Sequence, residues 1–448
     1  MQQIGFTNFR RFEYFPLLDL GKITFLVGGN NTGKSSMMKA LILTLDNLKR
    51  KCKWIDDGLE NPQFKFDANK LHDVHIGTFW RALNNNAIEK HISFVLKIQD
   101  ITFEIIVTCN DNDKDNEFET MSPISRITMT DHLRQATLIF DYQNGKMSAS
   151  IQKGNTYNQI EKPLSSVNIL AFNSDVANRT YALAQEWERE GGKINAKLLR
   201  DIANDAVAAI NNNVIEYIHT HAAAQKIVYS YEDKNDYIAA VLHDFDNEQL
   251  NSRDKNKVHK EIQKWMKDFG IGDDFIMQPL SGSAYSVQII SERNKNGIEL
   301  ADIGVGFIQL MILFWRLGIM IFQYAKSPVA PTVIIEEPEQ NLHPALQSKL
   351  ALLFYDVSKK YDIRFLIETH SEYIIRATQN IVGDQKYKNQ EELNAKCPLK
   401  VYYFNEDGLP YDMGYTPTGM FSENFGEGFF DEAGRLFMSV LNREEQKK

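Results

Sequence analysis

The sequence predicts an α/β fold, in which helices flank a mixed sheet and a helical segment interrupts the chain's path through it. Three short apolar runs, typical of buried parallel strands, support this prediction: Lys22–Val27, Thr332–Ile335 and Phe365–Glu368. Apolar residues at helical spacing predict one helix over Ser36–Lys49, after the first run, and another over His343–Lys360, between the other two. Because this β-α-β order is typical of one parallel sheet, we expect the chain to leave its α/β core and return to it.

Further strands are predicted in the N-terminal part of the chain. Ile92–Ile98 and Ile101–Thr108 alternate apolar and polar residues and flank a two-residue turn, which predicts a hairpin. Leu138–Tyr142 and Lys146–Gln152 flank a second turn that contains Asn-Gly, a strong hairpin signal.

Helical and strongly charged sequence follows, from about Asn178 to Phe269, and predicts exposed helices. This segment lacks the sustained heptads of a long coiled coil. Strand-like runs return from about Phe275. We therefore expect three parts, a first lobe over residues 1–175, a helical insertion over residues 176–274 and a second lobe over residues 275–448.

The charge and cysteine content restrict the protein's surroundings. The 448 residues carry a formal net charge of −9, which argues against coating nucleic acid through overall charge but leaves a local basic groove possible. The three cysteines, Cys52, Cys109 and Cys397, lie far apart in the sequence, which suits a reducing compartment. The N-terminus lacks the apolar core of a signal peptide. We expect a cytoplasmic protein.

One apolar segment, Ile308–Ala325, is long enough to resemble a membrane span. Gln309, Arg316 and Gln323 are spaced seven residues apart within it, so they form one polar line along a helix. An arginine at mid-span would be costly in lipid. We therefore expect a helix buried in a soluble core and no membrane partner.

The strongest motif is Gly28–Ser35, which has the form G-x-x-x-x-G-K-S and lies between a predicted strand and a predicted helix. Glycines allow the backbone to curl so that successive N–H groups face phosphate oxygens, and the helix N-terminus adds partial positive charge. Lys34 is expected to neutralise the β- and γ-phosphates of a nucleotide, and the Ser35 hydroxyl to hold Mg²⁺. The motif predicts a phosphate-binding loop.

Acidic residues follow the predicted strand Thr332–Ile335. Glu336 can support Mg²⁺ beside the phosphate-binding loop, because a rigid strand fixes the position of its carboxylate. Glu337 can act as the general base that activates the attacking water.

Two further features extend this pattern. His370 follows the predicted strand Phe365–Glu368, so it can hydrogen-bond the γ-phosphate. Gly304 and Gly306 precede the apolar helix, and glycines before a helix N-terminus predict a second anion site. A single chain needs only one phosphate-binding site for one nucleotide. Two such sites are expected if two chains pair and the second site of each chain completes the nucleotide site of the other.

Taken in order, these motifs resemble those of the ABC-type ATPases of the SMC–RecF–OLD group. Within that group the chain looks most like OLD-like AAA ATPases, such as the ATPase subunits of the Septu and PARIS anti-phage systems. The resemblance covers roughly Met1–Asp175 and Phe275–Leu441 and implies the ABC-type P-loop ATPase head as the fold. It implies that Gly28–Ser35 is the Walker A loop, Ile334–Glu337 the Walker B strand and Asp302–Gln309 the signature motif.

The resemblance also implies a set of residues that contact ATP. An Asn and an Arg near the first strand of that group lie close to the nucleotide, which implies such contacts for Asn8 and Arg10. The full expected set is Asn8, Arg10, Gly28, Asn30, Asn31, Thr32, Gly33, Lys34, Ser35, Ser36, Gly304 and Gly306. Three departures stand out. Glu336 replaces the usual Asp, the signature motif lacks its usual Ser, and no Q-loop matches firmly, the best candidate being Asp73–Gly77.

The predicted function is that of an ATPase that uses ATP and Mg²⁺ and forms a homodimer or a higher homo-oligomer. Many OLD proteins carry a C-terminal Toprim nuclease domain of roughly 100 residues. Only 78 residues follow His370, so we expect a partner effector, a nuclease or a toxin, to carry any destructive activity.

Two alternatives stay open. One is a DNA-repair ATPase whose dimer clamps a duplex, which DNA-stimulated hydrolysis would favour. The other is a nucleotide-gated scaffold that hydrolyses little ATP, which a change of oligomer mass between ATP and ADP would favour.

Overall fold

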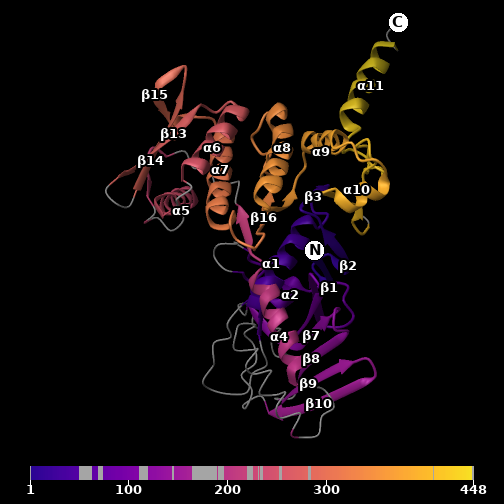
Figure 1. Cartoon of the computed structure of the whole chain (residues 1–448). Helices are drawn as coiled ribbons and strands as arrows, with labels where there is room; N and C mark the ends of the chain where they lie inside the picture. The colour runs from indigo at the N-terminus through magenta and orange to yellow at the C-terminus, as the bar shows by residue number, and fades with distance from the viewer. Residues whose placement is uncertain are drawn as a thin grey trace. The chain divides into compact units, whose positions relative to one another are not determined.

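The structure is a computed structural model (Figure 1). It describes residues 2–49, 63–68, 74–109, 120–143, 146–163, 189, 196–218, 226–230, 232, 236–251, 255–280, 284–406 and 408–445. The chain forms two compact units, the first made of Met1–Gly21 and Gly33–Ile215, the second of Lys22–Thr32 and Glu216–Lys448. Residue 175 lies outside the described residues, and the division into two lobes and an insertion stays a prediction.

A nine-stranded antiparallel sheet dominates the first unit, in the order β10-β9-β8-β7-β6-β5-β1-β2, with β4 paired to β7. Its strands are β1 (Gln2–Phe9), β2 (Phe12–Leu20), β4 (Gln63–Lys65), β5 (His91–Ile98), β6 (Ile101–Thr108), β7 (Met121–Asp131), β8 (Ala136–Gln143), β9 (Lys146–Lys153) and β10 (Thr156–Pro163). Both predicted hairpins are confirmed, because β5 pairs with β6 and β8 with β9.

Helices and aromatic side chains complete the first unit. Its helices are α1 (Lys34–Lys49), α2 (Phe79–Ala82) and α4 (Ala196–Asn211). The predicted helix after the phosphate-binding loop is therefore confirmed. Phe6 stacks on Phe15, and Phe64 stacks on Phe94, so aromatic pairs link β1 to β2 and β4 to β5.

The second unit contains a six-stranded sheet, in the order β11-β16-β17-β3-β18-β19. Its strands are β3 (Ile23–Gly28), β11 (Ile215–Ile218), β16 (Thr332–Glu336), β17 (Arg364–Glu368), β18 (Leu399–Phe404) and β19 (Tyr411–Asp412). The four strands β16, β17, β3 and β18 are parallel to one another, whereas β19 is antiparallel to β18. The predicted parallel core of three apolar runs, and the mixed α/β fold, are confirmed.

Helices and a small sheet surround these strands within the second unit. The helices are α5 (Tyr237–Asn251), α6 (Lys255–Phe269), α7 (Val305–Tyr324), α8 (Pro344–Tyr361), α9 (Glu372–Asp384), α10 (Gln390–Lys396) and α11 (Glu432–Glu445). The small sheet contains β12 (Tyr229–Ser230), β13 (Asp274–Leu280), β14 (Ala284–Ser291) and β15 (Asn294–Glu299). Helices α5 and α6 lie within the segment that the sequence predicts to be helical and strongly charged, as does α4 of the first unit.

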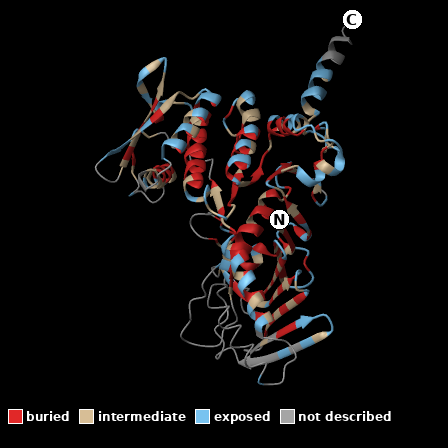
Figure 2. Cartoon of the chain, in the orientation of Figure 1, coloured by how far each residue is buried: buried red, intermediate tan, exposed pale blue. Residues whose placement is uncertain are grey.

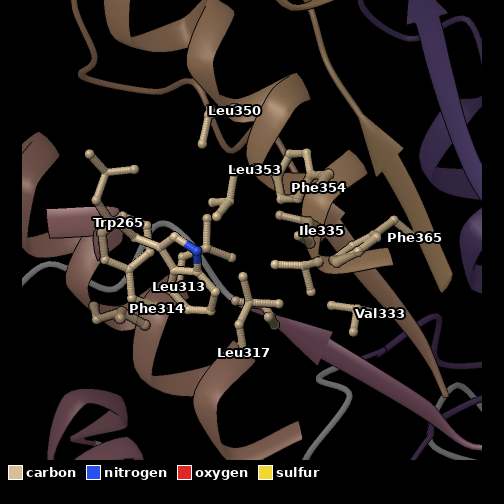
Figure 3. Packing of buried hydrophobic residues seen from close by; sticks show 14 of the residues in the cluster. Trp265, Leu313, Phe314, Leu317, Val333, Ile335, Leu350, Leu353, Phe354 and Phe365 are labelled. Atoms are coloured by element: carbon tan, nitrogen blue, oxygen red, sulfur yellow. The ribbon is translucent and has the colours of Figure 1, made fainter. Parts of the chain in front are cut away.

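Side chains from α6, α7, α8 and the parallel strands share one hydrophobic core. Figure 3 shows Trp265 of α6 and Phe314 of α7 facing the same interior as Ile335 of β16 and Phe365 of β17. Each of these side chains is at most 4% exposed, so the core joins the helices firmly to the sheet.

Helix α7 is the apolar segment that resembles a membrane span, and it meets the length and composition of one. Its most apolar window is 83% buried inside the protein (Figure 2). All three polar residues of its predicted line have partners. Gln309 accepts a hydrogen bond from Asn341, the Arg316 guanidinium contacts Asp244 at 3.2 Å and Glu216 at 3.5 Å, and Gln323 donates to Glu248.

Candidate catalytic edge of the parallel sheet

The first part of the phosphate-binding loop extends from the carboxyl end of β3. Gly28 has a φ of +140°, and a Cβ atom at this position would lie 2.3 Å from the carbonyl oxygen of Phe404. Only glycine therefore fits beside β18. Asn31 adopts a left-handed φ of 60°, and the Thr32 hydroxyl donates to the carbonyl oxygen of Gly29 at 2.9 Å. The loop curls as the motif predicts.

The second part of the loop, from Gly33 onward, belongs to the first unit and begins α1. Gly33 has a φ of +102°, and a Cβ atom there would lie 2.3 Å from the ring of Phe12. The amide of Met37 donates to the carbonyl oxygen of Gly33, which starts the hydrogen bonds of the helix. Lys34 is only 2% exposed at the N-terminus of this helix, where partial positive charge favours an anion.

Parallel pairing aligns the acidic end of β16 with the ends of its neighbours. Glu336 is in register with Glu368 of β17, and Glu368 is in register with Leu26 of β3. Because carboxyl ends of parallel strands meet at one edge of a sheet, Gly28–Thr32 and the predicted metal ligand Glu336 share that edge.

Glu337 lies immediately beyond the strand, in a left-handed conformation with a φ of 44°. Its amide donates to the carbonyl oxygen of Glu368 at 2.8 Å, which ties this turn to β17. One carboxylate oxygen accepts a hydrogen bond of 2.6 Å from the Gln340 side chain, and the other lies 3.6 Å from Nε2 of His370. The structure thus brings together Glu337 and His370, two residues that the sequence assigned to catalysis.

Sequence reasoning missed Glu339, which fixes the backbone of His370. The Glu339 carboxylate is 8% exposed and accepts a hydrogen bond of 2.7 Å from the His370 amide. Burial raises the pKa of this carboxyl group, and the His370 amide opposes that shift. Its burial and its hydrogen bond become visible only once β16 and β17 are paired.

Gly304 and Gly306 lie at the start of α7, as predicted, but they differ in their surroundings. Gly304 caps the helix, and a Cβ atom there would meet no atom within 4 Å. A Cβ atom at Gly306 would lie 2.4 Å from the carbonyl oxygen of Asn341, in the turn after the acidic strand. Gly306 therefore lets α7 approach that turn closely, which spacing in the sequence did not indicate.

Asn8 lies near the end of β1, and Arg10 lies in the tight connection between β1 and β2; both have a left-handed φ. The Asn8 side chain donates to the carbonyl oxygen of His91, and the Arg10 amide donates to that of Ala82. Burial and the nearby charge of Arg81 lower the pKa of the Arg10 guanidinium. Their contacts with ATP stay a prediction.

Arg11 is a second residue that sequence reasoning did not select. The Arg11 Cδ lies 3.0 Å from the point where a Cβ atom added at Gly33 would be, and the Arg11 guanidinium lies over the Phe12 ring. A positive charge thus lies beside the part of the phosphate-binding loop that begins α1. The pair Arg10-Arg11 is visible in the sequence, but a contact with ATP was predicted only for Arg10.

The two predicted metal ligands suit Mg²⁺ chemically. A hydroxyl (Ser35) and a carboxylate (Glu336) are hard oxygen ligands, and Mg²⁺ commonly takes one or two of these together with phosphate oxygens and water. Among the described residues, no group of three His, Cys, Asp or Glu side chains is arranged to hold a metal ion without such outside ligands.

Comparison with known proteins gives one family and several solved structures. The family model described as "AAA ATPase domain" matches residues 1–375, a range that contains the phosphate-binding loop, Glu336, Glu337 and His370. No curated protein matches the chain.

The solved structures include an SmcHead bound to the C-winged helix domain of ScpA, with 12% identity, a TM-score of 0.41, and coverage of 92% of this chain and 97% of that one. They also include an SMC head domain from Thermotoga maritima, with 11% identity, a TM-score of 0.33, and coverage of 92% of this chain and 98% of that one. A third is an Smc head domain bound to the C-terminal domain of ScpA derived from Pyrococcus furiosus, with 11% identity, a TM-score of 0.35, and coverage of 98% of this chain and 100% of that one. Because these TM-scores are low, the fold rests on the sheet topology above.

Gly306→Ala should destabilise the protein by about 1–3 kcal/mol, because the added methyl group meets backbone and not a flexible side chain. The matched control is Gly304→Ala, whose methyl group enters open space. Urea unfolding monitored by circular dichroism checks this difference. Equal unfolding midpoints for the two variants would contradict the packing described for Gly306.

Proposed function

This chain belongs to the family of the AAA ATPase domain, and from that premise we propose that it binds ATP with Mg²⁺ at Gly28–Ser35 and hydrolyses it. The main support for the proposal is that Glu337 and His370 lie close together at the sheet edge from which the loop extends. A phosphate-binding loop alone supports binding. A carboxylate held at the same edge supports activation of water for hydrolysis.

The loop residues bind and orient the triphosphate in this proposal. Backbone N–H groups of Gly28–Thr32 and the N-terminus of α1 contact phosphate oxygens, and Lys34 neutralises the β- and γ-phosphates. Asn30, Asn31, Gly33 and Ser36 complete the contacts. The Ser35 hydroxyl and the Glu336 carboxylate hold Mg²⁺, which when bound neutralises charge on the β- and γ-phosphate oxygens.

Glu337 acts as the general base and accepts a proton from the attacking water. Its two anchors support this role, since Gln340 and His370 fix the direction of its carboxylate. A fixed orientation lowers the entropic cost of reaching the reacting geometry. His370 hydrogen-bonds the γ-phosphate in our proposal, and its amide is held by Glu339.

Glu337→Gln should lower the steady-state rate of ATP turnover at least about 100-fold while it preserves ATP binding, because the amide cannot accept the proton from water. A matched control is Glu391→Gln on the exposed face of α10, which should turn over ATP like the wild type. Phosphate release gives the rate, and equilibrium binding of a fluorescent ATP analogue gives the affinity. Turnover by Glu337→Gln at the wild-type rate would exclude this base.

We further propose that each ATP site is completed by a second chain, in a homodimer or a higher homo-oligomer. The support is the N-terminus of α7, a twenty-residue helix that begins after Gly304 and whose partial positive charge favours an anion. The open space around Gly304 allows the backbone of the partner's α7 to approach the γ-phosphate closely. Because the signature motif lacks Ser, backbone N–H groups make this contact.

Two inactive variants should restore activity when they are mixed. Lys34→Ala removes the binding of phosphate within its own chain, and Gly304→Glu places a negative charge where the second chain would meet phosphate. A mixed dimer contains one site with both parts intact, so an equal mixture should recover about a quarter of the wild-type turnover under random pairing. Each variant alone is the control, and no recovery would contradict sites shared between chains.

We propose that this ATPase is cytoplasmic and controls a partner effector, a nuclease or toxin, in bacterial anti-phage defence. The support is the resemblance of its ordered motifs to those of defence ATPases, together with a sequence that carries one set of ATP motifs and no second catalytic constellation. Affinity purification of the wild type and Glu337→Gln with ATP tests this role. Recovery of one nuclease or toxin with the hydrolysis-deficient variant would support it, and recovery of none with either form would contradict it.

A further inference from the structure

Helix α6 carries four lysines along one exposed face, which we name the lysine stripe: Lys257, Lys260, Lys264 and Lys267. Their spacing of three and four residues places them in one sector of the helix. The opposite face is buried, and its Trp265 lies in the core shared with α7 and α8 (Figure 3). The orientation of the stripe toward solvent is therefore fixed by packing.

The stripe brings like charges together on one helix, and Glu261 and Asp268 of the same helix offset only part of this charge. Like charges three or four residues apart repel and cost a few tenths of a kcal/mol per pair. Lys267 lies 3.6 Å from Asp273, and Lys257 lies over the Tyr361 ring. Lys260 and Lys264 form no ion pair with the residues that the structure describes. A row of partly unneutralised lysines on a chain with a net charge of −9 indicates a negatively charged partner.

The adjoining helix α8 extends this positive surface. Lys349 donates to the carbonyl oxygen of Asp268, and Lys360 pairs with Glu261 at 2.5 Å, so both lie at the contact between α8 and α6. The second contact neutralises Glu261, an acidic residue of the helix that carries the stripe. Lys359 adds a further exposed charge over the Tyr355 ring. Helices α6 and α8 also carry the exposed carboxylates Asp268 and Asp356.

We propose that the lysine stripe binds the phosphate backbone of duplex DNA. Lys257 and Lys267 are separated by ten residues, or about 15 Å along the helix axis, and a duplex carries about four phosphates per strand over that length of its own axis. The stripe itself contains no aromatic side chain. Single-stranded nucleic acid is usually bound by stacking on aromatic rings, so backbone contacts with a duplex fit this surface better.

The test uses the full chain and a short fluorescent DNA duplex, with anisotropy measured over a series of salt concentrations. Lys260→Gln/Lys264→Gln keeps good helix formers and removes two positive charges. It should weaken binding at low salt by about tenfold or more, and it should lower the slope of log affinity against log salt by roughly 2, since each phosphate contact contributes about 0.9.

The matched control replaces two exposed lysines outside the stripe, Lys153→Gln and Lys295→Gln, and should bind DNA like the wild type. ATP turnover without DNA should be unchanged in both double variants, which confirms folding and separates this test from that of the ATPase. Equal affinity and salt slope in the stripe variant and the wild type would overturn the proposal.

Three further outcomes would also overturn it. Absence of duplex binding by the wild type would exclude DNA as the partner. Equal binding of a single strand of the same length would exclude a preference for the duplex. Stripe-dependent binding of polyglutamate without binding of DNA would indicate an acidic protein as the partner.

Discussion

The parallel pairing of β3 with β17 on one side and β18 on the other is the constraint on which the site depends. Backbone hydrogen bonds fix Phe25 opposite both Ile367 and Val401. This register sets where each strand ends, so the phosphate-binding loop and the residues after β16 and β17 emerge at one edge. A slip of one residue in such pairing would turn every side chain of the strand to the opposite face.

Local backbone conformations then aim the side chains at that edge. Gly28 turns the chain past Phe404 at a distance that a side chain would not permit. Glu337 adopts a left-handed conformation that costs a residue with a side chain about 1–2 kcal/mol. The hydrogen bond from its amide to Glu368 stabilises that turn, which presents the carboxylate to Gln340 and His370. The core beneath the sheet supplies the free energy that offsets this local cost.

Much of this arrangement could be predicted from the sequence, because the phosphate-binding loop and the apolar strands are local patterns. The phosphate-binding loop Gly28–Ser35 is recognisable by the spacing of its glycines and lysine. Glu337 and His370 follow strands that are recognisable by their apolar composition. Burial of the apolar helix α7 was also predictable, since Arg316 within it disfavours lipid.

Other features depend on contacts between residues far apart in the chain, which a local pattern does not encode. Glu339 is one acidic residue among several until β17 brings the His370 amide to within 2.7 Å. Gly306 is one glycine among several until α7 packs on the turn that contains Asn341. The order of the strands around β3 is likewise a property of the folded sheet, as is the pairing of β11 with β16.

Calorimetric titration of ATP with Mg²⁺ into the wild type and Lys34→Ala tests the central claim most directly. Lys34 follows the curled loop at the start of α1, where its positive charge would neutralise negative charge on the phosphates. We predict saturable binding by the wild type and a loss of at least about 2 kcal/mol of binding free energy in the variant, from the lost charge-assisted contacts. Equal affinity in both proteins, or no binding by the wild type, would contradict the assignment of this sheet edge as a nucleotide site.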